Sequence, residues 1–215
     1  MSPAAPIVHL VDDDASFLKA VARTLSVSGF TVKTFDSAAS LLAEVTAESR
    51  GCVVADLRMP GVSGLGLQDA LAASCLTLPV ILLTGQADIP SSVRAMRQGA
   101  EDFLEKRAPR QQLLDAVTRA LTRDAREHAD RNRLQALRAA FDVLTPRERE
   151  VLSHVVRGQL NKQIASDLNI HERTVKLHRT AITSKLNVHS VAELTRLAQA
   201  AGLFDAGSTT FPKGQ

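Results

Sequence analysis

Five residues that lie far apart in the sequence have side chains that could together carry out phosphoryl transfer. They are Asp12, Asp13, Asp56, Thr84 and Lys106. Three carboxylates held close together repel one another, and a divalent cation relieves that repulsion. Because oxygen ligands without His or Cys are typical of Mg²⁺, magnesium is the expected cation. A carboxylate beside the cation, a hydroxyl and a lysine could attack a phosphoryl group whose oxygens the other groups stabilise.

The pattern of apolar runs indicates which elements would position these residues. The runs predict strands, and the segments between them have the apolar spacing of helices. The predicted strands are 7–11, 31–35, 52–55, 80–83 and 103–104, and the predicted helices are 16–28, 38–46, 65–73, 90–98 and 110–123. Runs that are apolar throughout are typical of a parallel sheet with helices on both faces. The predicted fold class is therefore α/β, with a doubly wound five-stranded parallel sheet.

All five reactive residues follow a predicted strand. Asp12 and Asp13 follow the first strand, Asp56 the third, Thr84 the fourth and Lys106 the fifth. In a parallel sheet the carboxyl ends of the strands lie at one edge, where ligands bind. Any single acid could be ordinary surface charge, but that explanation is weak for five residues at the same edge. The sequence therefore predicts one phosphoryl-transfer site at this edge.

The positive charge of the chain lies in its second half. Residues 1–125 carry 12 Lys and Arg against 14 Asp and Glu, a net charge of −2, whereas residues 126–215 carry 14 against 9, a net charge of +5. A basic region favours a polyanionic partner, although a difference of this size could also arise by chance.

From Thr145 onward the pattern is entirely helical. Thr145-Pro146-Arg147-Glu148 is a capping box with proline at the first helical position. Further helices are predicted at 162–168 and 172–185, separated by a turn at 169–171, and Ser190 caps a last helix. Two short helices joined by a tight turn, in a basic region, are typical of a helix-turn-helix domain that inserts its second helix into the major groove.

The helix 172–185 has two distinct faces. Val175, Ile182 and Leu186 form a stripe that we expect to be buried. Lys176, Arg179 and Thr180 are then predicted to face away. A charged helix face of this kind could read DNA bases or could simply be solvated.

Residues 7–125 resemble the receiver domain of two-component response regulators, which has the CheY-like fold. The resemblance rests on Val11-Asp12-Asp13, Asp56-Leu57-Arg58-Met59-Pro60, Thr84-Gly85 and Lys106. It implies that a sensor histidine kinase phosphorylates Asp56, with Thr84 and Lys106 assisting. It also implies Mg²⁺ bound by Asp13, Asp56 and the backbone carbonyl of Arg58, and partly through water by Asp12. Phe103 matches the aromatic switch position, which turns inward when the Thr84 hydroxyl moves to the phosphate.

One departure from the receiver pattern lies beside Lys106. The family usually has proline after this lysine, often through a cis peptide, whereas Arg107 follows here. A cis bond to a residue other than proline costs about 3–4 kcal/mol. Either the loop is trans and locally rearranged, or it stores strain.

Residues 144–200 resemble the DNA-binding domain of the LuxR/FixJ/NarL type. The matching segments are Leu144–Leu152, Asn161–Ala165, Arg173–Lys176 and His178–Leu186. The resemblance implies that 172–185 is the recognition helix, with Lys176, Leu177 and Thr180 near bases. It places Lys162, Thr174, His178 and Arg179 near phosphates, although His178 could instead pack inside the domain. It also implies dimerisation through the last helix, whose apolar stripe could equally complete the domain's own core.

Together these observations predict a response regulator with four segments. They are a receiver domain at 6–123, a helical linker at 124–143, a helix-turn-helix domain at 144–203 and a disordered tail at 204–215. Phosphorylation is expected to promote homodimerisation through residues 85–123 and binding to double-stranded promoter DNA, most often for activation, with RNA polymerase as a further partner. The chain is not expected to be an enzyme beyond assisting its own phosphorylation and dephosphorylation.

Two alternatives remain open from the sequence. Asp12-Asp13-Asp14-Ala15-Ser16 fits a loose motif of haloacid-dehalogenase-like phosphatases, with Asp12 as the nucleophile. The second alternative is a DNA-binding protein whose receiver domain only dimerises and is never phosphorylated.

The composition indicates the compartment in which the protein is expected to work. The sequence has no long apolar run and no basic, apolar start typical of a signal peptide, so a cytoplasmic protein without a membrane span is expected. Cys52 and Cys75 lie in apolar surroundings and are predicted to be buried, reduced thiols.

Overall fold

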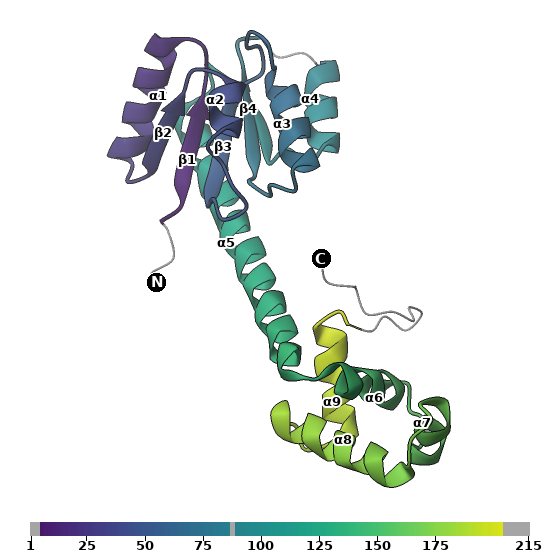
Figure 1. Cartoon of the computed structure of the whole chain (residues 1–215). Helices are drawn as coiled ribbons and strands as arrows, with labels where there is room; N and C mark the ends of the chain where they lie inside the picture. Colours follow the sequence, from purple (N-terminus) through teal and green to yellow (C-terminus); the bar gives the residue numbers. More distant parts are fainter. Residues whose placement is uncertain (1–4, 87–88, 204–215) are drawn as a thin grey trace. The chain divides into compact units, whose positions relative to one another are not determined.

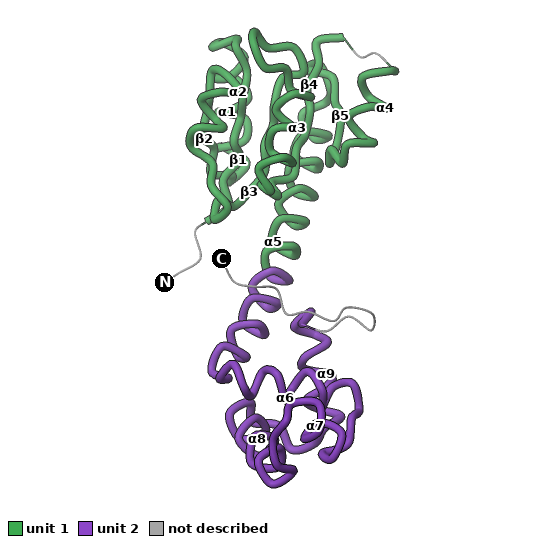
Figure 2. Tube along the Cα trace, turned by 45° about the vertical axis from the view of Figure 1, so that its right-hand side comes forward, with its two compact units in different colours: residues 1–128 green, residues 129–215 purple. Residues whose placement is uncertain are grey.

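The computed structural model describes residues 5–86 and 89–203. The chain divides into two compact units between His128 and Ala129 (Figure 2). Each unit has its own buried core. The predicted tail at 204–215 lies outside the described residues.

The N-terminal unit is built on the predicted five-stranded parallel sheet, which is confirmed. Its strands are β1 (Ile7–Val11), β2 (Thr31–Phe35), β3 (Gly51–Asp56), β4 (Val80–Thr84) and β5 (Asp102–Glu105). The strand order is β2-β1-β3-β4-β5, so β1 and β4 both pair with β3. The carboxyl ends of these three neighbours therefore lie side by side.

Helices cover both faces of the sheet (Figure 1). They are α1 (Ala15–Val27), α2 (Ala38–Leu42), α3 (Gly64–Ala73), α4 (Ile89–Arg97) and α5 (Arg110–Ala140). Along β3, Val53 and Ala55 belong to a core shared with α2, α3 and α4. Cys52 and Val54 belong to the opposite core, shared with α1 and α5. Because successive strand residues point to opposite faces, an uninterrupted apolar strand supplies both cores.

The second helix is shorter than predicted. Helix α2 ends at Leu42 rather than continuing to Thr46. Beyond Leu42, the N–H groups of Glu44 and Val45 both bond to the carbonyl of Leu41. Val45 remains buried in the core beside α2, so its apolar side chain continues the helical pattern although the backbone has turned.

The fifth helix includes both the predicted helix 110–123 and most of the predicted helical linker. Asp124, the first residue of that linker, is buried in the N-terminal unit. Its carboxylate accepts hydrogen bonds from Nε of Arg50 at 2.9 Å and from the backbone N–H of Gly51 at 3.2 Å. At the other end, Leu137 packs against the core of the C-terminal unit. The ends of the predicted linker are thus parts of the two folded units.

The C-terminal unit is all helical up to residue 203, the last described residue, as predicted. After a 3₁₀ turn at Phe141–Val143 it contains α6 (Pro146–Val156), α7 (Asn161–Asp167), α8 (Glu172–Lys185) and α9 (Val191–Ala200). The capping box of Thr145 and Glu148 is present at the start of α6, and Ser190 caps α9. Leu194 and Ala198 are buried in the core of the unit. The apolar stripe of α9 therefore completes that core.

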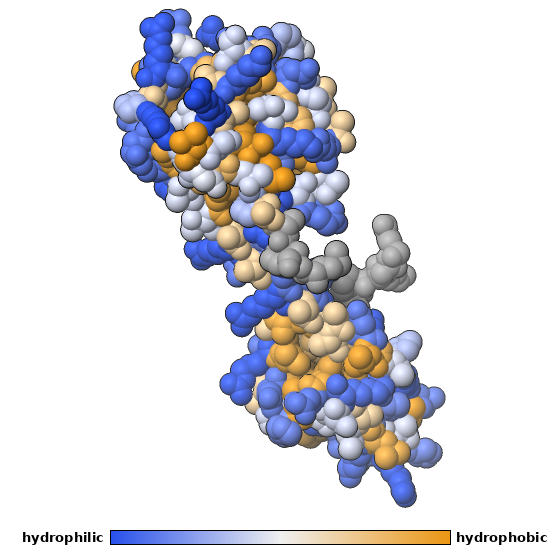
Figure 3. Space-filling model, turned by 90° about the vertical axis from the view of Figure 1, so that its left-hand side faces the viewer, coloured by the Kyte–Doolittle hydropathy of each residue, from blue (hydrophilic) through white to orange (hydrophobic). Residues whose placement is uncertain are grey.

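The surface corrects one prediction from composition. Cys52 is buried, but Cys75 is exposed, because the chain leaves α3 through a left-handed conformation at Cys75 with φ of 55°. On the face shown in Figure 3, hydrophilic and hydrophobic residues are interspersed over both units. None of the helices within 5–86 and 89–203 is both long and apolar enough to cross a bilayer.

Candidate phosphoryl-transfer site and DNA interface

The structure brings three of the predicted acids together at the carboxyl edge of the sheet. Asp12 follows β1, Asp13 comes next, and Asp56 ends the adjacent β3. One carboxylate oxygen from each residue lies within 4.8 Å of the others. Asp12 and Asp56 are buried, whereas Asp13 is exposed. This arrangement leaves the cluster open to solvent on the Asp13 side.

Lys106 reaches the same cluster from the end of β5. Its Nζ lies 2.7 Å from Oδ2 of Asp12 and 3.2 Å from Oδ2 of Asp56. The backbone N–H of Lys106 donates to the carbonyl of Thr84 at 2.7 Å, which fixes the loop to the end of β4. No cis peptide occurs in the described residues, so the bond to Arg107 is trans.

Lys106 also contacts an aromatic ring, which the sequence did not indicate. The Nζ atom lies 4.5 Å from the centre of the Phe17 ring. Phe17 is on the first turn of α1, which Asp14 caps by accepting hydrogen bonds from the N–H groups of Ser16 and Phe17. The only sequence signal for this contact was the position of Phe17 just after the aspartates, which by itself predicts a core residue.

The local electrostatics favour a protonated lysine beside a carboxylate that is harder to ionise. Burial raises the pKa of Asp56 most, the ammonium of Lys106 and the N–H of Arg58 lower it, and the neighbouring Asp12 raises it, with a net increase. For Lys106, burial alone would lower the pKa, but the two carboxylates outweigh burial and raise it. Lys106 therefore stays positively charged over the physiological range.

The donor set fits a small divalent cation. The three acids carry three negative charges when ionised, and Lys106 neutralises one of them. Although Nζ of Lys106 is close, Oδ2 of Asp12 is buried and accepts no hydrogen bond of acceptable geometry. A buried, incompletely bonded carboxylate oxygen among other oxygen donors is suited to Mg²⁺. Arg58, whose backbone carbonyl is the predicted fourth ligand, follows the end of β3 and lies two residues after Asp56 in the sequence.

The hydroxyl of Thr84 points elsewhere in this structure. Thr84 is buried at the end of β4, and its Oγ1 donates to the carbonyl of Gln86 at 2.8 Å and accepts from the N–H of Gln86 at 3.3 Å. Phe103 on β5 is partly buried against the core shared with α4. Thr84 is therefore at the predicted edge, but its hydroxyl is bonded within its own loop.

On α8, the predicted faces are largely as expected. Val175 and Ile182 are buried, whereas Lys176 and Thr180 are exposed. Leu177 is 64% exposed, which is unusual for a large apolar side chain and suits contact with a base methyl group. Among the remaining predicted contacts, Lys162 on α7 is exposed, and Thr174 and His178 are half-buried.

Arg179 departs from its prediction. It is half-buried, and its Nη1 donates a 2.8 Å hydrogen bond to Oδ1 of Asn161, the first residue of α7. The helical pattern contained the signal, because Arg179 lies four residues after the buried Val175 and so shares its side of the helix. Arg179 therefore faces α7 rather than away from the domain.

An ion pair between the buried Glu148 and the exposed Lys185, which no sequence pattern indicated, joins α8 to α6. Nζ of Lys185 contacts both carboxylate oxygens of Glu148, at 2.9 and 2.7 Å. Oε2 of Glu148 also accepts from the N–H of Thr145 at 2.8 Å. The hydrogen bond from Lys185 is the main cause that lowers the pKa of Glu148, burial opposes it, and the bonds from Thr145 add to it. The capping residue thus also anchors α8.

We expect Glu148→Gln to destabilise the C-terminal unit by about 1 kcal/mol at neutral pH, because a glutamine keeps the cap but loses the charge pair, which solvent partly screens at Lys185. A group with a lowered folded-state pKa stabilises above its unfolded pKa and loses that contribution as the pH falls through the lowered value. The difference between the wild type and the variant should therefore disappear on acidification. Amide hydrogen exchange of α6 and α8 measures this difference in stability. A difference that persists in acid would contradict the stabilising role of the Glu148–Lys185 charge pair.

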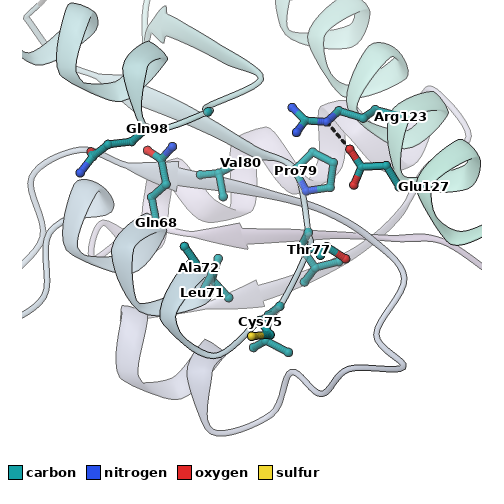
Figure 4. Close-up of a pocket in the computed structure, with 13 residues that line it drawn as sticks. Gln68, Leu71, Ala72, Cys75, Thr77, Pro79, Val80, Gln98, Arg123 and Glu127 are labelled. Atoms are coloured by element: carbon teal, nitrogen blue, oxygen red, sulfur yellow. Dashed lines mark hydrogen bonds and ion pairs between the residues drawn. The ribbon is translucent and has the colours of Figure 1, made fainter. Parts of the chain in front are cut away.

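A separate cavity of about 270 Å³ lies at the opposite end of β4 (Figure 4). Its lining includes Leu71, Cys75, Pro79 and Val80, with the ion pair of Arg123 and Glu127 at one side. None of the predicted site residues lines it.

Comparisons of sequence agree with the two-unit architecture. Residues 8–118 match the response regulator receiver domain, and residues 142–198 match the LuxR family of bacterial regulatory proteins. The transcriptional regulatory protein FixJ of Rhizobium meliloti is 40% identical over 195 residues, covering 91% of this chain and 96% of the relative. Nodulation protein W of Bradyrhizobium diazoefficiens is 38% identical over 197 residues, covering 92% and 87%.

Solved structures extend the similarity to both units. The response regulator StyR, known at low resolution, has a TM-score of 0.79 and 44% identity, covering 91% of this chain and 99% of that chain. Full-length FixJ from B. japonicum has a TM-score of 0.55 and 33% identity, covering 93% and 98%. The chain therefore belongs to the two-component response regulators that join a receiver domain to a LuxR-family DNA-binding domain and regulate transcription.

Proposed function

We propose that a sensor histidine kinase phosphorylates this chain on Asp56, and that phosphorylation promotes dimerisation and binding to promoter DNA. The observation that carries the proposal is the cluster of Asp12, Asp13 and Asp56 with the ammonium of Lys106 against two of its carboxylates. Since the proposed target is chromosomal DNA, the proposed place of action is the cytoplasm, and activation through contact with RNA polymerase is the proposed output.

The proposed reaction is a phosphoryl exchange between two side chains. A carboxylate oxygen of Asp56 attacks the phosphorus of a phosphohistidine, a P–O bond forms, the P–N bond breaks, and the imidazole leaves with the electron pair and later takes up a proton. Lys106 would stabilise the phosphoryl oxygens, and the Thr84 hydroxyl would do so after leaving Gln86. Asp13, Asp56 and the Arg58 carbonyl, with Asp12 partly through water, would hold a magnesium ion, which would neutralise the charge that gathers at the site.

Magnesium should stabilise the N-terminal unit because it binds the folded cluster and not the unfolded chain. We expect a rise in the unfolding temperature with MgCl₂ that Asp13→Asn removes or greatly reduces. Asp14→Asn is a matched control, since it deletes a neighbouring charge but keeps a good helix cap. Thermal unfolding with and without Mg²⁺ measures the effect. Equal stabilisation of the wild type and Asp13→Asn would rule out Asp13 as a ligand.

A surface within the proposed dimerisation region, residues 85–123, lies on α4. Ile89, Val93 and Met96 are 78%, 43% and 50% exposed and have the spacing of one helix face. Exposed apolar residues gathered on one face suit contact with a second copy. Converting a mostly inactive population to a mostly active one requires a difference of about 5 kcal/mol between the two states, which such a contact could contribute.

The proposed DNA-binding face comprises side chains of α7 and α8. Lys176, Leu177 and Thr180 would approach bases, and Lys162, Thr174, His178 and Arg179 would approach phosphates. Exposure of Lys176, Leu177 and Thr180 on one side of a helix packed against α6 and α7 supports this assignment.

Beryllofluoride, a phosphoryl mimic, tests the proposed function directly. With Mg²⁺ and beryllofluoride, the full chain should elute earlier in gel filtration and bind a duplex selected from a random pool more tightly. Asp56→Asn should respond in neither assay. DNA binding that is unchanged by the mimic would instead favour the alternative in which the receiver domain is never phosphorylated.

A further inference from the structure

Three of the polar contacts that join α6, α7 and α8 to one another are made by an arginine or a lysine. Nη2 of Arg147 on α6 donates to the carbonyl of Leu168 at the end of α7, at 2.8 Å. Lys185 at the end of α8 is paired with Glu148. Both contacts involve helix ends. The third contact, between Arg179 and Asn161, differs because it lies midway along α8, next to Thr180.

Arg179 has donors to spare after this contact. A guanidinium carries five N–H groups in a fixed plane, and the bond to Asn161 uses one of them. Arg179 is half-buried, so part of the residue still meets solvent. Asn161 is half-buried beside the exposed Lys162, another proposed phosphate contact. The bond therefore holds a cation at the edge shared by α7 and α8.

A long charged side chain that is free in solution loses conformational freedom when it binds a phosphate. A partner that already fixes the guanidinium plane removes most of that cost, because the planar group keeps its orientation. Asn161 suits this role, since its amide is neutral and does not compete with the phosphate as a carboxylate would.

We propose that Asn161 is a positioning residue for DNA binding, which acts by holding the guanidinium of Arg179 ready for a backbone phosphate. This inference rests on the proposed function, because it requires that α8 meets DNA. It assigns to Asn161 an effect on affinity that passes through Arg179 and involves no contact of its own with DNA.

The effect can be separated from a purely structural one by salt dependence and by a double-mutant cycle. Loss of one phosphate contact reduces the slope of log K against log salt by about 1, whereas loss of preorganisation lowers affinity at constant slope. The full chain with Mg²⁺ and beryllofluoride is titrated onto a duplex selected from a random pool by the wild type. Variants are Asn161→Ala, Asn161→Gln, Arg179→Ala and the Asn161→Ala/Arg179→Ala double variant.

We expect Asn161→Ala to weaken binding about 5- to 10-fold with an unchanged slope. Arg179→Ala should weaken binding and reduce the slope by about 1, and the double variant should match Arg179→Ala. Asn161→Gln, which keeps the amide oxygen, should recover part of the affinity. Ser166→Ala, at an exposed position of the same helix, is the control and should bind as the wild type does.

Three results would overturn the inference. They are an effect of Asn161→Ala that persists in the Arg179→Ala background, an Arg179→Ala slope equal to that of the wild type, and wild-type affinity in Asn161→Ala. Amide hydrogen exchange of α7 and α8 checks that each variant is folded; if Asn161→Ala does not fold, Asn161→Gln is carried through the same cycle. A wild type that binds no DNA would refute the proposed function instead, so the two failures can be told apart.

Discussion

Replacement of Asp56 by asparagine is expected to abolish covalent phosphorylation of the chain. An amide has nearly the same shape as the carboxylate but lacks the nucleophilic oxygen that attacks phosphorus. Incubation with acetyl phosphate and Mg²⁺, followed by intact-mass measurement, should show one added phosphoryl group on the wild type and none on Asp56→Asn. Asp14→Asn, which removes a nearby charge but preserves the cap of α1, should be labelled as the wild type is.

The same assay distinguishes the phosphatase alternative. That alternative requires Asp12 as the nucleophile, so labelling would persist in Asp56→Asn and disappear in Asp12→Asn.

Labelling should also depend on pH in a specific direction. Burial raises the pKa of Asp56, so its reactive carboxylate is lost on acidification at a higher pH than for an ordinary aspartate. Labelling measured at a saturating concentration of Mg²⁺ should begin to fall at a lower pH than labelling measured at a limiting concentration, since a bound cation favours the carboxylate form.

The substitution Gly51→Ala is expected to unfold the N-terminal unit. Gly51 begins β3 with φ of +124°, and an added Cβ would lie 1.8 Å from the backbone carbonyl oxygen of Ile7. The contact is with backbone of the neighbouring strand, so no side-chain rotation can relieve it. Because the φ is also unfavourable for alanine, we expect the free energy of unfolding to fall by more than about 4 kcal/mol, which is comparable to the stability of many domains.

Gly29→Ala is the matched control. Gly29 also has a positive φ, of +91°, but a Cβ there would meet no atom within 4 Å. Gly29→Ala should therefore lower the free energy of unfolding only by the cost of placing alanine in a left-handed backbone conformation, about 1–2 kcal/mol. Circular dichroism during thermal unfolding measures both variants. Equal stability of the two would show that the sheet can move apart at Gly51 and that the steric argument is wrong.

The C-terminal unit gives an internal reference for this experiment. It is a separate compact unit with its own core, so its amides should remain protected from exchange in Gly51→Ala. Loss of protection in both units would mean that the fold of the second depends on the first.

Much of this architecture follows from local sequence signals. Uninterrupted apolar runs such as Cys52–Ala55 predicted buried parallel strands, because only a strand covered on both faces is apolar at every position. The capping box at Thr145 and the cap at Ser190 marked helix starts by side-chain chemistry that depends on a few adjacent residues. The convergence of Asp12, Asp13, Asp56 and Lys106 followed from topology, since parallel strands all end at one edge.

Other features depended on residues distant in the sequence, and no local pattern encodes them. Asp124 lies in a polar segment that predicted a linker, yet it is buried because Arg50 and Gly51 lie beside it in space. The spacing from Val175 indicated the side of α8 on which Arg179 lies, but its partner Asn161 was fixed only by the packing of α7 against α8. The exposure of Cys75 and the early end of α2 were likewise decided by how the chain turns to pack Val45 and to leave α3.

The sequence alone thus determined which elements form and at which edge the reactive residues meet, because those properties arise from periodicity and strand direction. The tertiary structure decided which side chains pair, which thiol is exposed and how the Thr84 hydroxyl is bonded. These depend on contacts of a few ångströms between elements, and such contacts are fixed only when all the elements pack together.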